Sequence, residues 1–151
     1  VQGGRVTQFQ TFMTGEVFAL MSQHSILGKT LDLQGAFDEA AFLQGIDQSQ
    51  QAGSVLHHLF AVRTLGLFER LSAAQLASYL SGLLIGEELR AQAVSNDAAP
   101  LILIGSVALT LRYTLALQHL KIPCQSRGAE ATWAGLFALA SSLAFTGGHV
   151  S

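Results

Sequence analysis

The chain has 151 residues, enough for one domain with a sizeable core. Half of its residues are hydrophobic and only 12% are charged, which suggests that some apolar surface packs against something outside the chain. The formal net charge of −2 gives no electrostatic reason to expect a nucleic-acid partner. Because Cys124 is the single cysteine, an internal disulfide is excluded and no zinc site is expected.

The two ends of the chain carry no targeting or membrane signal. Val1 is followed by no basic region or cleavage pattern, so the sequence does not read as an intact secretory precursor. Residues 131–151 carry no formal charge, but several polar residues and glycines interrupt them. Because a membrane span needs about 20 predominantly apolar residues, we expect no membrane partner. The composition agrees with a piece of a cytoplasmic enzyme, and we expect that localisation.

The first predicted elements are a strand and a helix. Residues 5–12 alternate in part and are rich in β-formers, which predicts a strand. Thr14-Gly15-Glu16 then opens a helix that extends to about Gln23, followed by a loop over residues 24–35.

Capping signals predict the next two helices. Asp38 can cap a helix that ends near Gln50, with Phe37 and Phe42 at hydrophobic-staple positions. Ser54 can cap another helix that ends near Phe68. Five large residues supply much of one apolar face of that helix: Leu56, Leu59, Phe60, Leu67 and Phe68.

The longest predicted helix begins at Ser72 and extends to about Gln92. Ser72 and Gln75 match a capping box, and Leu71 with Leu76 matches a second staple. Apolar residues then recur at helical spacing: Leu76, Tyr79, Leu80, Leu83, Leu84 and Leu89.

Strands and helices alternate in the last third. Residues 101–105 predict a strand, and a helix follows to about Lys121. Residues 122–125 predict another short strand, and residues 129–143 a final helix. The complete order predicts an α/β protein with a mixed sheet and several helices.

The strand that ends at Gly105-Ser106 leads directly into a helix, LILIGSVALTLRYTLAL over residues 101–117. Backbone N–H groups at such a turn can receive a nucleotide, although one glycine in a strand-to-helix turn is also common as a simple connection. The turn has neither the glycines of a dinucleotide fingerprint nor the lysine of a Walker motif.

Five segments in this order resemble the C-terminal half of the 2-dehydro-3-deoxygalactonokinase family. They are TFMTGEVFALMSQHSIL (11–27), LHHLFAVRTLGLF (56–68), YLSGLLIGEEL (79–89), the 101–117 segment and ATWAGLFALA (131–140). The family consists of bacterial sugar-acid kinases of the actin/Hsp70/sugar-kinase superfamily. The resemblance implies that residues 1–151 form a single C-terminal kinase domain, half of a ribonuclease-H-like, actin-like ATPase fold.

The resemblance also implies the reaction and its requirements. The γ-phosphoryl group of ATP, with Mg²⁺, would pass to the 6-hydroxyl of 2-dehydro-3-deoxy-D-galactonate. The catalytic acidic residue and the phosphate loops would lie upstream, in an N-terminal domain absent from this chain. A related kinase with another sugar or sugar-acid substrate is one alternative, and a non-catalytic helical binding module is another.

Four residues are candidates for nucleotide binding. In the resembling family the turn at Gly105 and Ser106 would contact adenosine, because a glycine lets a ligand approach the backbone; otherwise it is a connecting turn capped by Ser106. Gly82 and Gly86 lie one turn apart on a common helix face. They indicate either close helix packing or clearance for the nucleotide.

Other candidates concern the cleft. Thr14, Gly15 and Glu16 would face the interdomain cleft or simply begin a helix. Arg63 would bind the substrate carboxylate through its planar guanidinium, or form a structural ion pair with Glu69 or Asp47.

No metal or acid–base site is predicted. His57 and His58 are adjacent and therefore point in different directions on a helix, so metal ligation is not expected. Glu87, Glu88 and Arg90 are interpreted as a solvated helix end. No catalytic base is identified in the chain.

Overall fold

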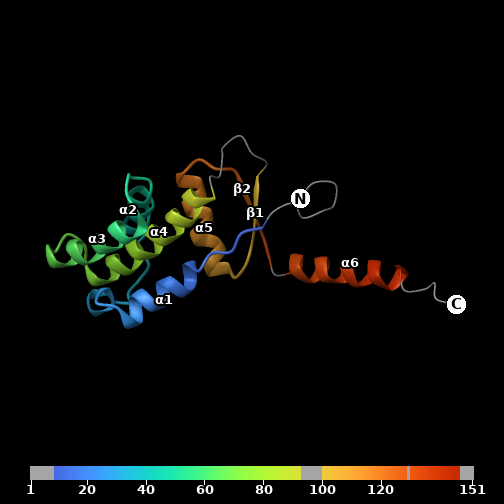
Figure 1. Ribbon diagram of the computed structural model, residues 1–151, viewed down its shortest axis with the longest axis horizontal. Coiled ribbons are helices and arrows are strands. Elements are labelled where there is room, and N and C mark those ends of the chain that lie inside the picture. Colours follow the sequence, from blue (N-terminus) through green and yellow to red (C-terminus); the bar gives the residue numbers. More distant parts are fainter. Residues whose placement is uncertain (1–8, 93–99, 129, 147–151) are drawn as a thin grey trace. The chain divides into compact units, whose positions relative to one another are not determined.

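The computed structural model describes residues 9–92, 100–128 and 130–146 (Figure 1). Backbone contacts group the chain into two compact units, residues 1–93 and 94–151. Each unit is described by itself. That the chain forms a single C-terminal kinase domain stays a prediction.

The first unit is helical. Its helices are α1 (Thr14–His24), α2 (Glu39–Ser49), α3 (Val55–Leu67) and α4 (Ala73–Ala91), with a short 3-10 helix, η1 (Leu27–Thr30), after α1. The four predicted helices are thus confirmed to within about two residues at each end.

The predicted strand at residues 5–12 is wrong for its described part. Residues 9–13 have no regular secondary structure and Phe9 is exposed, while residues 5–8 lie outside the described ranges. A strand needs a neighbour to receive its backbone hydrogen bonds. None of the described residues pairs with this segment.

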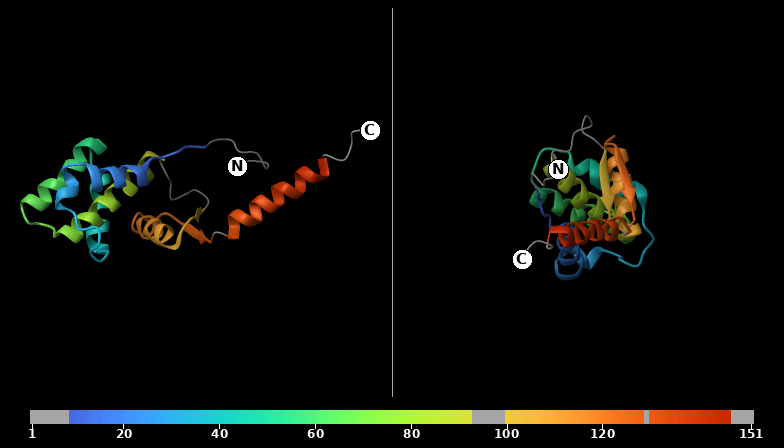
Figure 2. Two further views of the ribbon diagram at one scale, coloured as in Figure 1. Left: turned by 90° about the horizontal axis from the view of Figure 1, so that it is seen from below. Right: turned by 90° about the vertical axis from the view of Figure 1, so that its right-hand side faces the viewer.

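Helix α4 is the centre of the first unit. Figures 1 and 2 show α2 and α3 lying along α4, and α1 also packs against it. Every apolar residue predicted for its core-facing side is buried: Leu76, Tyr79, Leu80, Leu83, Leu84 and Leu89. Helical spacing therefore identified the buried side of α4 correctly.

Local capping contacts form as predicted at two helices. The Ser72 hydroxyl accepts from the Gln75 N–H, and the Gln75 side-chain oxygen accepts from the Ser72 N–H, which completes the capping box. Asp38 Oδ1 accepts from the Ala41 N–H at 2.8 Å. The rings of Phe37 and Phe42 lie 5.4 Å apart between centroids, as the staple requires. Ser54 stands at the N-cap of α3 but its side chain makes no capping hydrogen bond.

The predicted apolar face of α3 is wrong. Leu56, Phe60, Leu67 and Phe68 are exposed, whereas His58 and Val62 are completely buried and Leu59 is partly buried. Residues at 55, 58, 59, 62 and 65 share one side of a helix with 3.6 residues per turn. Because α3 carries large apolar residues on both sides, hydrophobicity alone did not reveal which side faces α4.

Three glycines let α2 and α4 approach closely. A Cβ at Gly45 would overlap the Tyr79 carbonyl oxygen, and a Cβ at Gly82 would overlap the Phe42 carbonyl oxygen. A Cβ at Gly86 would overlap the Ser49 hydroxyl. Helix packing therefore accounts for these glycines without any ligand.

The second unit has a β-α-β arrangement followed by a helix. Its elements are β1 (Leu101–Ile104), α5 (Val107–His119), β2 (Cys124–Arg127) and α6 (Glu130–Thr146). The two strands are parallel, with Leu101 opposite Cys124 and Ile104 opposite Arg127 (Figure 2). Helix α5 packs against both strands.

The α/β class is confirmed, but the sheet differs from the prediction. The described residues form a two-stranded parallel sheet in place of a mixed sheet. The second strand begins at Cys124, two residues later than predicted. The reason is local: the Ile122 N–H bonds to the Leu117 carbonyl at the end of α5, while the Pro123 carbonyl accepts from the Leu101 N–H.

Helix α6 exposes most of the apolar residues between positions 130 and 141, the part whose side chains the structure describes. Trp133, Leu136, Phe137 and Leu139 are all more than half exposed. A helix that is apolar on all sides is normally covered. Among the described helices, none combines the length and apolar character that a bilayer crossing requires.

Candidate functional site

The turn between β1 and α5 has open backbone groups. Ser106 is extended, with φ −65° and ψ 152°, and stands at the N-cap of α5 without a side-chain capping bond. Its carbonyl accepts from the Leu109 and Thr110 N–H groups. The Ser106 hydroxyl therefore does not make the capping hydrogen bond expected of it. The first backbone N–H groups of α5 remain available to another acceptor.

Gly105 borders a hollow of about 260 Å³ between β1 and the first turns of α5. Leu109, Thr110 and Tyr113 of α5 line its other side. A Cβ at Gly105 would meet the Thr110 side chain at 3.6 Å, an ordinary contact, and Gly105 does not adopt a left-handed φ. Nothing within the described second unit therefore demands a glycine at this turn.

Gly82 and Gly86 differ from Gly105 in their surroundings. Both are buried against α2, where backbone and Ser49 fill the space beside them. Close packing, one of the two interpretations of their spacing, explains them fully. The nucleotide role implied for Gly82 and Gly86 is therefore not carried into the proposal below.

The start of α1 contacts the end of α4. Thr14 Oγ1 donates a hydrogen bond to Glu88 Oε2, a contact between residues 74 apart in the sequence. Gly15 and Glu16 are exposed, and a Cβ at Gly15 would meet nothing within 4 Å. Thus the 11–27 and 79–89 segments, two of the five that carry the family resemblance, meet in the structure.

The predicted solvated end of α4 is wrong for Glu87. Its side chain is 12% exposed, and Oε1 lies 2.8 Å from Nδ1 of His58, which is completely buried. Glu87 Oε2 also pairs with Arg90. The prediction missed this cluster because its members come from two helices and only their packing brings them together.

Arg63 is half-buried on α3. Within the described ranges it forms neither of the predicted ion pairs, with Glu69 or with Asp47. Its role toward a substrate carboxylate stays a prediction. Across those same ranges, no three His, Cys, Asp or Glu side chains are grouped so that they could hold a metal ion.

Comparison with known proteins gives one consistent result. Residues 1–139 match the family model of 2-keto-3-deoxy-galactonokinase. The 2-dehydro-3-deoxygalactonokinase of Escherichia coli K12 is 32% identical over 143 residues, which cover 93% of this chain and 48% of that protein. A Rhizobium meliloti protein provisionally given the same name is 34% identical and covers 92% of this chain and 47% of its own length.

A solved structure agrees. The crystal structure of a Sinorhizobium meliloti protein, provisionally named a 2-dehydro-3-deoxygalactonokinase, superimposes with a TM-score of 0.78 at 32% identity. The match covers 89% of this chain and 45% of that one. The chain spans about half the length of the curated relatives it matches. The family model covers most of the chain, and the chain therefore belongs to the 2-keto-3-deoxy-galactonokinase family.

Proposed function

We propose that this chain is the C-terminal, nucleotide-binding half of a cytoplasmic sugar-acid kinase with an actin-like ATPase fold. The enzyme transfers the γ-phosphoryl group of ATP to the 6-hydroxyl of 2-dehydro-3-deoxy-D-galactonate. Family membership and the names of the relatives support the kinase class and the sugar-acid substrate.

The observation that carries the proposal is the turn at Gly105. It joins a strand to a helix N-terminus, borders a hollow, and holds a glycine that its own surroundings do not require. Adenosine fits such a place, because a glycine leaves the backbone accessible and the helix N-terminus favours electron-rich groups.

We assign the adenosine part of ATP and the Mg²⁺ ion to different parts of the enzyme. Gly105, Ser106 and the first turn of α5 would hold the adenosine part of ATP. Within the described ranges, no three His, Cys, Asp or Glu side chains are grouped so that they could hold a metal ion. We assign the phosphates, the metal and the catalytic base to the part of the relatives' length that this chain does not match, where phosphoryl transfer would depend on positioning and charge stabilisation.

The test is Gly105→Val in the full-length enzyme. The new side chain enters the hollow, while the backbone there needs no left-handed φ, so we expect normal folding. The KM for ATP should rise about tenfold or more, and the KM for the sugar acid should change little. Gly135→Ala is the control, because a Cβ at Gly135 meets nothing within 4 Å.

An unchanged ATP dependence in a well-folded Gly105→Val enzyme would remove the adenosine assignment. A variant that only loses active fraction, with equal effects on both substrates, would assign a structural role to the turn.

Arg63 gives the complementary test for the substrate. Arg63→Ala should weaken the sugar acid more than ATP if the guanidinium binds the carboxylate. Arg70→Ala, which removes an exposed cation near the end of α3, is the matched control. Equal effects of the two variants on the sugar-acid KM would exclude Arg63 from the substrate site.

A further inference from the structure

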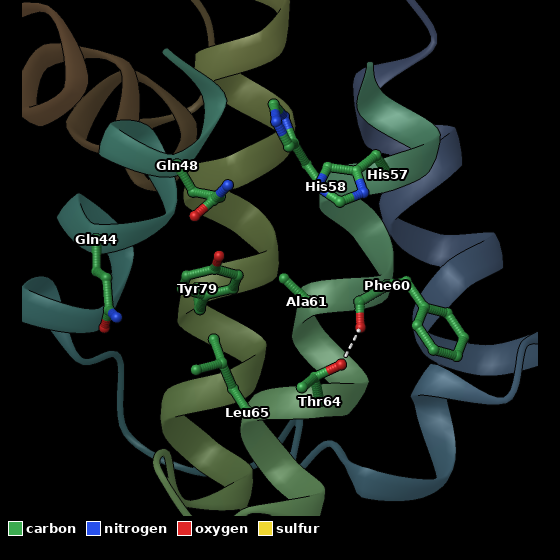
Figure 3. Close-up of a pocket in the computed structure, with 9 residues that line it drawn as sticks. All are labelled: Gln44, Gln48, His57, His58, Phe60, Ala61, Thr64, Leu65 and Tyr79. Carbon is green, nitrogen blue, oxygen red and sulfur yellow. Dashed lines mark hydrogen bonds between the residues drawn. The ribbon is translucent and has the colours of Figure 1, made fainter. Parts of the chain in front are cut away.

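A second hollow lies within the first unit, among α2, α3 and α4. Its volume is about 320 Å³, and Figure 3 shows the nine side chains around it. None of the nine is Asp, Glu, Lys or Arg. This volume lies within the range of small-molecule sites in proteins.

Tyr79 of α4 contributes an unpartnered hydroxyl to this hollow. The residue is 1% exposed, and its side chain lines the hollow (Figure 3). No hydrogen bond joins that hydroxyl to another described residue. Because no fully buried side-chain nitrogen or oxygen of the described residues lacks a partner, the hydroxyl is open to the hollow. The hydroxyl can therefore donate to a molecule that enters the hollow in place of water.

Burial also keeps the Tyr79 hydroxyl a donor. Removal from water raises the pKa of Tyr79 to about 12, because desolvation disfavours the phenolate. The group therefore stays protonated at every physiological pH and offers an O–H to whatever enters the hollow.

Some of the other polar side chains that line the hollow already have a hydrogen-bond partner, and others do not. His58 faces Glu87, and the Thr64 hydroxyl donates to the Phe60 carbonyl. The side-chain amides of Gln44 and Gln48 on α2 have no such partner among the described residues, and Figure 3 shows Gln48 beside the hydroxyl end of Tyr79. Each amide can both donate and accept.

Apart from His57, the remaining wall is apolar. Phe60, Ala61 and Leu65 of α3 line it. No carboxylate, ammonium or guanidinium group lines the hollow to pair with a charged ligand, which favours an uncharged one. An uncharged ligand with an apolar body and a polar end can pack against the apolar wall and form hydrogen bonds with Tyr79 and the two glutamines.

We propose that this hollow binds a small uncharged molecule with a carboxamide on an apolar body. Its carbonyl accepts from the Tyr79 hydroxyl, the Gln44 and Gln48 amides engage the rest of the carboxamide, and its apolar part contacts Phe60 and Leu65. This site shares no residue with the turn at Gly105.

The experiment uses benzamide as the probe, with the full-length protein that contains this chain. Ligand-observed NMR titration should give a dissociation constant on the order of 1 mM, as expected for a molecule of this size. Benzoate, which has nearly the same shape but a charge, and toluene, which lacks the amide, should each bind at least about fivefold more weakly.

Tyr79→Phe removes only the hydroxyl and should weaken benzamide about fivefold. Tyr113→Phe is the matched control, because Tyr113 is the second of the two tyrosines and belongs to the other unit. The control variant should bind benzamide as the wild type does.

Ala61→Leu provides an independent test, since it fills the hollow and leaves Tyr79 in place. It should abolish benzamide binding. The proposal is overturned if Ala61→Leu or a folded Tyr79→Phe variant binds benzamide like the wild type, or if benzoate binds as tightly as benzamide.

Discussion

Nδ1 of His58 lies 2.8 Å from Oε1 of Glu87, which joins the first turn of α3 to the last turns of α4. The imidazole is completely buried, and its Nε2 lies 3.3 Å from the carbonyl oxygen of Ala52. Glu87 also pairs with Arg90, which is 39% exposed in its side chain. One carboxylate thus has a buried partner and a partly exposed one.

These two partners should contribute unequally to stability. Glu87→Ala leaves a buried imidazole nitrogen without a partner, and we expect it to cost about 2–3 kcal/mol in the free energy of unfolding. Arg90→Ala removes only the more exposed partner and should cost less than about 1 kcal/mol. Urea denaturation of both variants measures the difference. Equal losses would show that burial of His58 does not determine the value of the contact.

The glycines between α2 and α4 should be intolerant of any side chain. Gly82→Ala places a methyl group against the Phe42 carbonyl, so the helices must separate, and we expect a loss of about 2–3 kcal/mol in the free energy of unfolding. Gly15→Ala, where a Cβ meets nothing within 4 Å, should cost less than about 0.5 kcal/mol. Thermal melting of both variants tests this contrast. A Gly82→Ala variant as stable as Gly15→Ala would contradict the close packing.

Asp38 should contribute to acid sensitivity. The hydrogen bond from the Ala41 N–H, and then that from the Gln75 side chain, lower the pKa of Asp38. Because its folded pKa lies below its unfolded value, its stabilising effect is present above the unfolded pKa and is lost as the pH falls through the folded pKa.

The measurement is the free energy of unfolding, obtained by urea denaturation at pH values between about 7 and about 2.5. A paired carboxylate takes up its proton over this range. Asp38→Asn keeps a capping oxygen but cannot titrate, so its stability should fall less steeply in acid than that of the wild type. Glu39→Gln, next in the chain and exposed, is the control. Identical acid profiles for Asp38→Asn and the wild type would refute the assignment.

Trp133 reports whether α6 is covered in the whole protein. It is the single tryptophan of the chain and is 73% exposed. In the isolated chain its fluorescence should resemble that of a tryptophan in water, and the chain should bind a hydrophobic dye or self-associate. In the longer protein, emission from the same residue should shift to shorter wavelength. A monodisperse isolated chain without dye binding, and with emission identical to that of the longer protein, would count against a missing partner half.

The isolated chain should have no kinase activity. On the proposed function its described residues would supply only a turn for adenosine, and phosphate binding and the catalytic base would come from the part of the relatives' length that this chain does not match. Release of ADP with 2-dehydro-3-deoxygalactonate, ATP and Mg²⁺ should stay at background. Turnover at about 1 s⁻¹ or more by the 151-residue chain would refute that division of roles.

Much of the first unit was predictable from local sequence. The capping contacts of Ser72 with Gln75 and of Asp38 with Ala41 join residues three apart, so their geometry follows once a helix begins. The core of α4 was predictable for the same reason, because its apolar residues repeat at the helical period on one side. Family membership rested on segments whose order and spacing are visible in the chain itself.

Tertiary structure decided what depends on distant pairs. Glu87 faces His58 across 29 residues and Glu88 faces Thr14 across 74, and no local pattern connects either pair. The buried side of α3 was ambiguous because both of its sides are apolar, and only packing against α4 selected His58 and Val62. Gly82 and Gly86 of α4 show the same division. Their spacing indicated a shared face, but whether a helix or a ligand occupies that face depends on which atoms lie opposite, here the Phe42 carbonyl and the Ser49 hydroxyl.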